Sequence, residues 1–201
     1  GMTFLLLLLL IAFAGSLGVK NVSILQVFYI ILDYLVSDEI FAKVSELDRR
    51  ILLYLRLPRI ALGVVGGATL AIAGVVMQGI MRNPLVSPFT IGISPAAGFG
   101  AAIAVLLGLD LITGGSYWVV LCAFSSALIC ATMVLTISVF RGAQSTTLIL
   151  AGIALTYFFG ALINTTQFIA TEEQLTVIVH WTFGSLNESK WEEVVIILIM
   201  L

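Results

Sequence analysis

The chain has 201 residues, of which 61 % are hydrophobic and 10 % are charged, and its mean hydropathy is +1.18. Soluble domains average roughly 45–50 % apolar and about 25 % charged residues, so this composition excludes a soluble globular protein and predicts an integral membrane protein. The net charge of −2, with no basic block, also argues against nucleic acid as a partner.

Several chemical functions lack the residues that they require. His180 is the only histidine, and Cys122 and Cys130 would lie roughly 12 Å apart along a helix, so neither a metal site nor a disulfide is expected. A phosphate-binding loop needs a glycine directly before its lysine, and no lysine here has one (Lys20, Lys43, Lys190). We therefore expect no cofactor, no ATP hydrolysis by this chain and no enzyme activity.

The chain begins with a leucine-rich run at residues 3–19 that is marginally long enough to span a bilayer. Ala12-Phe13-Ala14 matches a signal-peptidase site, but the basic residues that precede such a site are missing. We therefore favour a retained first helix over a cleaved signal peptide.

Residues 21–55 are predicted to form an interfacial connection. Apolar residues recur at helical spacing from Ile24 to Leu35, with polar residues between them, which is typical of an amphipathic helix lying on the membrane surface. A solvated, charge-mixed segment follows and contains Lys43, Glu46, Asp48, Arg49 and Arg50.

Long apolar runs then predict a polytopic, all-α helical bundle. The 22 residues from Ile60 to Met81 carry no charge and would extend roughly 33 Å, enough to cross a hydrocarbon core of about 30 Å. Gly63 and Gly67 form a small-xxx-small pair, which predicts close packing against other helices. With the first run, we expect five complete spans and the start of a sixth, at residues 3–19, 60–81, 89–109, 117–140, 148–169 and 194–201. Residues 170–193, between the last two, are expected to leave the membrane core.

A proline-broken turn follows the span at 60–81. Asn83-Pro84 should end that helix, Pro88 interrupts the chain again, and Ser94-Pro95 is typical of an N-cap and first turn of the next helix. The residues between are apolar, and such broken backbone at membrane depth is tolerated only where protein or a water-filled cavity satisfies it.

These motifs resemble the FecCD-type permease subunits of type II ABC importers, which move ferric siderophores, haem and cobalamin. The resemblance rests on RLPR (56–59), the Gly/Ala-rich helix with Gln78, RNPL-xx-P (82–88), IGIS-xxxGxG (91–100), TTLILAGIAL (146–155) and HWTFGSL (180–186). It implies a ten-helix permease fold, so the short run at 194–201 predicts a truncated, single permease domain over residues 1–201. It further predicts that these residues alone neither transport nor stimulate an ATPase.

The resemblance also implies the partners and the mechanism. A separate ATP-binding cassette ATPase would power alternating access, an extracytoplasmic substrate-binding protein would deliver the cargo, and a second permease subunit would complete the path in the cytoplasmic (inner) membrane. Two alternatives remain: a non-transporting membrane scaffold or assembly fragment, and an ion-coupled secondary transporter. The latter is disfavoured because acidic residues are absent from Ile60 to Ile169 except at Asp110.

Two criteria disagree on orientation. With five spans, one side receives seven basic residues and the other only Arg82 and Arg141. The positive-inside rule would place the seven in the cytoplasm. The resemblance implies the reverse, with RLPR outside, the N-terminus inside and residues 21–55 extracytoplasmic, and we follow the resemblance.

Arg56 and Arg59 are the first candidate site. They flank the predicted start of a helix, where positive charge is unfavourable by roughly 0.3–1 kcal/mol, so another interaction should hold them there. The resemblance implies docking of glutamates from the substrate-binding protein, whereas the simpler interpretation is snorkelling to lipid phosphates.

Small polar residues form two further candidates. The resemblance implies a cytoplasmic gate at Ser145, Thr146 and Thr147, and the alternative is an N-cap of the next span. Gln78, Asn164, Thr165 and Gln167 could line the translocation path or hydrogen-bond between helices, and the latter is slightly favoured. Trp181 and Trp191 are interpreted as interfacial aromatics.

Overall fold

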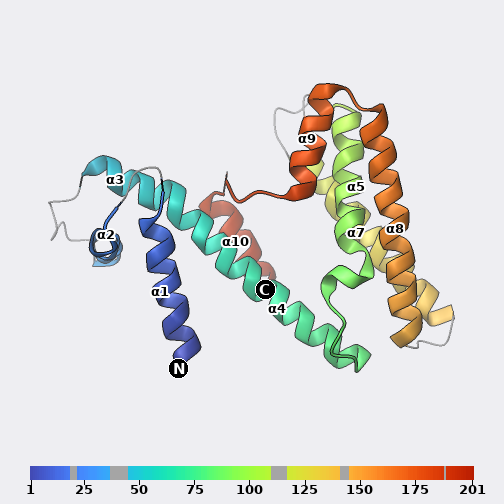
Figure 1. Cartoon of the computed structure of the whole chain (residues 1–201), viewed down its shortest axis with the longest axis horizontal. Helices are drawn as coiled ribbons and strands as arrows, with labels where there is room; N and C mark the ends of the chain where they lie inside the picture. The colour runs from blue at the N-terminus through green and yellow to red at the C-terminus, as the bar shows by residue number, and fades with distance from the viewer. Residues whose placement is uncertain (19–21, 37–44, 110–116, 141–144, 188) are drawn as a thin grey trace. The chain divides into compact units, whose positions relative to one another are not determined.

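The computed structural model describes residues 1–18, 22–36, 45–109, 117–140, 145–187 and 189–201, and the all-α prediction is confirmed for these (Figure 1). The described residues form helices and contain no strand. The helices are α1 Met2–Ser16, α2 Ile24–Val36, α3 Glu46–Arg50, η1 Ile51–Arg56, α4 Leu57–Met81, η2 Pro88–Ile91, α5 Ile93–Leu106, α7 Tyr117–Phe140, α8 Ser145–Ile169, α9 Glu172–Phe183 and α10 Trp191–Met200.

Three of the predicted spans coincide with helices that are long and apolar enough to cross a membrane. These are the continuous helix Glu46–Met81, α7 and α8, of 36, 24 and 25 residues. The predicted spans at 3–19 and 89–109 coincide with shorter apolar helices, α1 and α5, of 15 and 14 residues. The predicted turn at 110–116 and residues 141–144 of the next loop lie outside the described residues.

The chain forms two compact units, which we describe separately. The first contains residues 1–69 and 186–201, and the second contains residues 70–185. In the first unit α1 packs against α2, and the core joins α2 to η1 through buried Val22, Val27, Ile30, Leu52 and Leu53.

One feature of the first unit was not predicted: the charge-mixed segment with Glu46, Asp48, Arg49 and Arg50 belongs to a long helix, although Glu46 and Arg50 are exposed as expected. Residues 46–56 are helical, with α3 and η1 continuing into α4 without a break, and η1 is a π-helix. Asp48 is 9 % exposed, and Leu52 is fully buried against α2. The charged residues concealed the helix, because Glu46 and Arg50 pair on its exposed face, while the residues that pack inward, Leu52 and Leu53, follow in the next turn.

The π-helix leaves one backbone acceptor without its helical partner. At its end the Leu57 N–H donates to the Leu52 carbonyl, five residues earlier. The next donor in this register would be residue 58, which is a proline and has no N–H, so the Leu53 carbonyl is left over. The indole Nε1 of Trp191 donates to it at 3.0 Å. Trp191 therefore anchors the start of α10 to the π-helix, a role that its interpretation as an interfacial aromatic did not include.

Replacing Trp191 by phenylalanine should show how much the hydrogen bond from its indole to the Leu53 carbonyl contributes to stability. The substitution keeps the ring and removes the donor, so we expect a loss of about 1 kcal/mol in stability. In a Pro58→Ala background the new N–H can serve the Leu53 carbonyl, and the same substitution should cost less. A double-mutant cycle on thermal unfolding in detergent measures the difference, and equal costs in both backgrounds would contradict the assignment.

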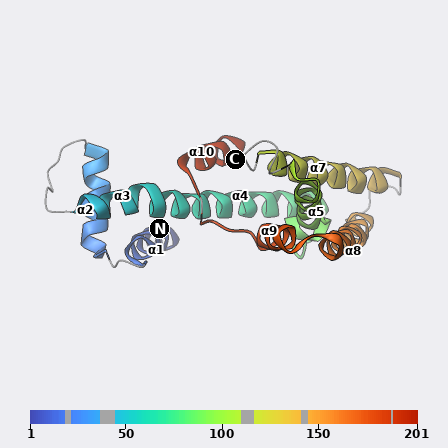
Figure 2. The ribbon, with the colours of Figure 1, turned by 90° about the horizontal axis from the view of Figure 1, so that it is seen from above.

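The second unit is organised around α5, which packs against α7, α8 and α9 (Figures 1 and 2). Alanines and glycines fill most of its buried positions (Ala96, Gly98, Gly100, Ala101, Ala102, Ala104). At Gly100 a Cβ would collide with the Cys122 carbonyl and lie 2.7 Å from the Ser126 Cβ. The small residues on the buried face of α5, and Gly100 in particular, therefore permit near-backbone contact with α7, as expected where lipid supplies no hydrophobic force between helices.

The close packing predicted for Gly63 and Gly67 is not found at those positions. No atom of the same unit lies within 4 Å of a Cβ built on Gly67, and the Gly63 Cβ would only touch the Leu186 side chain at 3.8 Å. Among the described residues, the glycines in near-backbone contact are Gly92, Gly100 and Gly152.

The proline-broken turn is confirmed, with one correction. Helix α4 ends at Met81, and Arg82 adopts a left-handed conformation (φ 47°) before Asn83-Pro84. Pro88 begins η2. Ser94 is not the N-cap of α5, because Gly92 occupies that position with φ 81°, a conformation that glycine adopts without strain. Ser94 and Pro95 therefore lie inside the first turn.

Residues 170–193 contain a further helix that the sequence did not predict. Helix α9 has 12 residues, is capped by Thr171 and buries Ile178 in the α5–α7 core. The Gln174 side-chain amide donates to the carbonyls of Val105 and Leu106 at 3.4 and 3.3 Å, which satisfies the C-terminal end of α5.

Candidate functional site

Arg56 binds the end of the first helix. It follows the π-helix in the first unit, and its Nη1 donates to the Gly15 carbonyl at 2.8 Å. Gly15 lies in the last turn of α1, where carbonyls lack intrahelical donors and where positive charge is favourable. Arg56 is half-buried and therefore acts as a C-terminal cap of α1.

Arg59 lies one turn later and is exposed. Its Nε donates to the Leu186 carbonyl at 3.1 Å and its Nη2 to the Asn187 carbonyl at 2.9 Å. The guanidinium therefore holds two successive carbonyls of the segment that leads into α10. Both predicted docking arginines thus have backbone partners within the chain.

The helix-dipole argument for these two arginines does not apply, because the helix begins at Glu46 and not at residue 57. Arg56 and Arg59 lie ten or more residues after that N-terminus, and dipole effects fall off within the first turn. The contacts with Gly15, Leu186 and Asn187 account for their positions instead.

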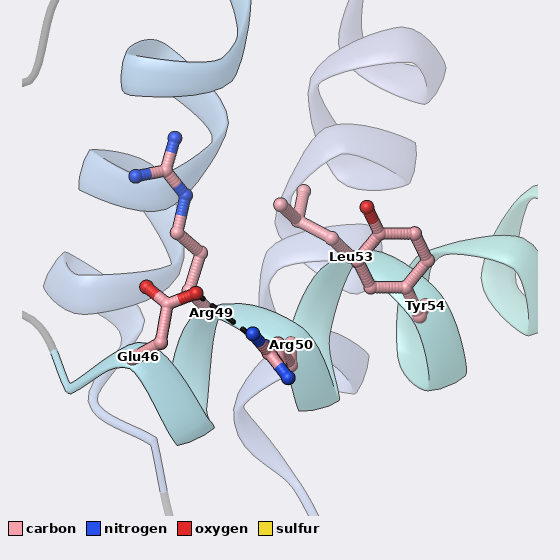
Figure 3. A pocket seen from close by; sticks show the side chains of 5 residues that line it. All are labelled: Glu46, Arg49, Arg50, Leu53 and Tyr54. Carbon is pink, nitrogen blue, oxygen red and sulfur yellow. Dashed lines mark hydrogen bonds and ion pairs between the residues drawn. The ribbon is translucent and has the colours of Figure 1, made fainter.

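A second group of charged residues lies on the same helix, nearer its start. Glu46, Arg49, Arg50, Leu53 and Tyr54 line a concave region of about 540 Å³ (Figure 3). Glu46 and Arg50 form an ion pair at 3.4 Å, with both side chains more than 70 % exposed. Such an exposed pair contributes little to stability. The Arg49 side chain points away from that pair and forms no hydrogen bond or ion pair with the described residues.

Gln78, a predicted path residue, closes its own turn. Its side-chain amide donates to the carbonyls of Pro84 and Val86 at 3.2 and 3.3 Å. Asn83 assists from within the turn, since its Oδ1 accepts from the Leu85 N–H at 3.0 Å. These bonds satisfy carbonyls that proline-broken backbone leaves without helical donors. In this structure Gln78 is thus a turn residue, which neither of its two predicted roles included.

Replacing Gln78 by leucine should therefore loosen the turn. Two bonds are lost, and we expect the free energy of unfolding to fall by roughly 1–2 kcal/mol. Thermal unfolding in detergent measures the effect. Gln167→Leu, on α8, is the matched control, and an equal loss in both variants would contradict the role given to Gln78.

The three predicted gate residues begin α8. Ser145 Oγ donates to the Met81 carbonyl at 2.8 Å and so joins the start of α8 to the end of α4. Thr146 is exposed, and Thr147 lines a groove of about 600 Å³ between α7 and α8. The side of α8 that carries Thr147 forms most of this groove (Ile137, Thr147, Leu150, Ala151, Ala154, Leu155, Phe158).

The polar cluster near the end of α8 does not form one site. Asn164 and Thr165 are exposed, and Thr165 Oγ1 donates to the Ala161 carbonyl of its own helix at 2.9 Å. Thr166 is buried and donates to Ile163 at 2.7 Å, while Gln167 is half-buried. Gln78 and Ser145 both bond backbone at the end of α4, Gln78 to the Pro84 carbonyl and Ser145 to the Met81 carbonyl. Asn164, Thr165 and Gln167 lie at the opposite end of α8 from Ser145.

One contact was outside the reach of sequence reasoning. Gly152 of α8 lies against the backbone of η2, where its Cβ would collide with the Thr90 carbonyl and lie 2.8 Å from the Ile91 Cα. The Cys130 thiol also faces the Ile91 carbonyl, at 3.7 Å. The broken turn is therefore fixed by α7 and α8 together. Among the described residues, no group of three or more His, Cys, Asp or Glu side chains is placed to hold a metal ion.

The chain is similar to a protein family and to several known proteins. A model described as the FecCD transport family matches residues 5–201. The molybdate import system permease protein of Haemophilus influenzae is 36 % identical over 192 residues, which cover 94 % of this chain and 55 % of that protein. The cobalamin import system permease protein of Halobacterium salinarum is 38 % identical over 143 residues, which cover 70 % of this chain and 37 % of that protein.

A solved structure is also similar. It is described as an inward-facing conformation of a metal-chelate type ABC transporter, and it aligns with a TM-score of 0.76 and 30 % identity over 98 % of this chain and 56 % of its own. This chain thus spans about half the length, or less, of the relatives that it matches.

Proposed function

Because the chain belongs to the FecCD transport family, we propose that it is the transmembrane permease subunit of an ABC importer for an iron chelate, haem or cobalamin. The observation that carries the proposal is the match of the family model to residues 5–201, nearly the whole chain. Similar proteins carry the names of molybdate and cobalamin import systems, so the cargo is the least determined part of the proposal.

The proposed mechanism needs no covalent chemistry from this chain. A separate ATPase would drive alternating access, in which packed helices shift as rigid bodies, and an extracytoplasmic binding protein would deliver the cargo to two permease subunits in the inner membrane. The packing of α5 on α7 supports this mechanism, because near-backbone contact makes these two helices one rigid body. We propose that residues 1–201 belong to one permease domain and that RLPR faces outward.

The proposed site residues follow from this orientation. Arg59 is exposed, and Arg56 lies one turn away with its guanidinium on the Gly15 carbonyl; we propose that both lie at the docking face. Thr147 lines the groove beside α8, which supports a gate at residues 145–147. Gln78, Asn164, Thr165 and Gln167 are proposed to border the path, with Gln78 also holding the broken turn.

Transport in reconstituted vesicles tests the proposal. The permease is combined with its ATPase and binding protein, and uptake of ferric siderophore, haem, cobalamin and molybdate is compared. We expect ATP-dependent uptake of one iron-chelate, haem or cobalamin cargo, and none with an ATPase variant that binds but cannot hydrolyse ATP. Uptake driven by an ion gradient without ATP, or no uptake of any cargo by an assembled complex, would contradict the proposal.

A further inference from the structure

The two predicted docking arginines differ in what they hold. Arg56 is half-buried and caps α1 through the Gly15 carbonyl. Arg59 is exposed, and the Nε–Nη2 edge of its guanidinium is occupied by the carbonyls of Leu186 and Asn187 at 3.1 and 2.9 Å. A partner that bound Arg56 would have to break its partly buried bond to the Gly15 carbonyl. Arg59 is exposed to water, so its guanidinium can exchange the two carbonyls for another acceptor.

The Nε–Nη2 edge presents two parallel donors, which a carboxylate accepts with both oxygens. Arg59 carries its charge in both arrangements, but a carboxylate adds a full negative charge and bidentate geometry, whereas the two carbonyls are neutral. A carboxylate that binds this edge must replace both carbonyls. An acidic partner at Arg59 would therefore compete directly with the segment that leads into α10.

We infer that docking of an acidic side chain from the binding protein transfers Arg59 from the Leu186 and Asn187 carbonyls to the incoming carboxylate and releases the segment before α10. This inference rests on the proposed docking role of Arg59. It adds that docking changes the permease itself, at a segment distant in sequence from the RLPR motif.

The contacts around the segment limit what would move. The Leu186 carbonyl also accepts from the Ser189 hydroxyl at 2.6 Å and from the Ser189 backbone N–H at 3.4 Å, so it keeps these two donors after Arg59 leaves. Trp191 remains bound to the Leu53 carbonyl and keeps the start of α10 on the π-helix. Among the described residues of the first unit, the release is therefore confined to Leu186, Asn187, Ser189 and Lys190, ahead of the anchored start of α10.

Hydrogen exchange on the complete transporter in lipid nanodiscs tests the inference. The amides of Leu186, Asn187, Ser189 and Lys190 are followed with and without saturating binding protein. In the wild type we expect docking to speed their exchange several-fold. In Arg59→Gln the exchange should already be fast without the partner, docking should not change it further, and the affinity for the binding protein should fall about tenfold or more.

Arg49→Gln is the matched control, because Arg49 lies on the same continuous helix and its side chain forms no hydrogen bond or ion pair with the described residues. It should leave both the affinity and the exchange at Leu186–Lys190 unchanged. If Arg59→Gln leaves the affinity unchanged, the proposed docking role fails. If the affinity falls but docking leaves exchange in the wild type unchanged or slows it, docking through Arg59 stands and the transfer from the carbonyls is wrong.

Discussion

Replacing Gly100 by alanine is expected to destabilise the second unit more than any other single methyl group added to α5. The new Cβ would overlap the Cys122 carbonyl and lie 2.7 Å from the Ser126 Cβ. Both are close to the α7 backbone and cannot rotate away, so the two helices must separate. Overpacking of this kind costs about 3 kcal/mol.

Thermal unfolding in detergent checks this prediction, with an expected fall in Tm of roughly 10 °C. The matched control is Gly98→Ala in the same helix. Its Cβ would meet only the Ile163 Cδ1, at 3.2 Å, and this is the mobile end of a flexible side chain. We expect a loss of about 1 kcal/mol or less there. Equal losses at both positions would mean that α5 and α7 are not held at backbone distance by Gly100.

Replacing Gly152 by alanine is expected to detach α8 from the broken turn. Its Cβ would collide with the Thr90 carbonyl and lie 2.8 Å from the Ile91 Cα. The turn cannot yield easily, because Gly92 next to it holds φ 81° and its own Cβ position lies 3.0 Å from the Thr156 N–H nitrogen. We expect a cost of about 2–3 kcal/mol and a loss of transport in the complete complex.

Thiol labelling distinguishes this local detachment from general unfolding. Cys130 is fully buried and faces the Ile91 carbonyl at 3.7 Å. In Gly152→Ala a membrane-permeant maleimide should modify Cys130 faster, while labelling of Cys122, on the α5 side of α7, should not change. Gly160→Ala, two turns along α8 with no atom of its unit within 4 Å, is the control and should behave as the wild type. Protection of Cys130 in both variants would contradict the contact.

The candidate site was only partly accessible from sequence. The RLPR motif identified Arg56 and Arg59 as unusual, but their partners lie 41 and 127 or more residues away. Gln78 was identified as polar in an apolar helix, and the structure shows it bonded to carbonyls of the turn that follows. Gln174 and Trp191 were missed as structural donors, because nothing in a sequence marks which distant carbonyl lacks a partner.

Features that depend on neighbouring residues could be predicted without the structure. These are the apolar runs that form α4, α7 and α8, and the end of α4 before Asn83-Pro84, because proline cannot donate the next helical bond. Which glycines matter follows only from how the helices pack. Gly63, Gly67, Gly100 and Gly152 all read as small residues in apolar helices, yet only the last two have another backbone against them. Whether a missing side chain permits close packing depends on which segment crosses at that level, and that is set by helices far away in sequence.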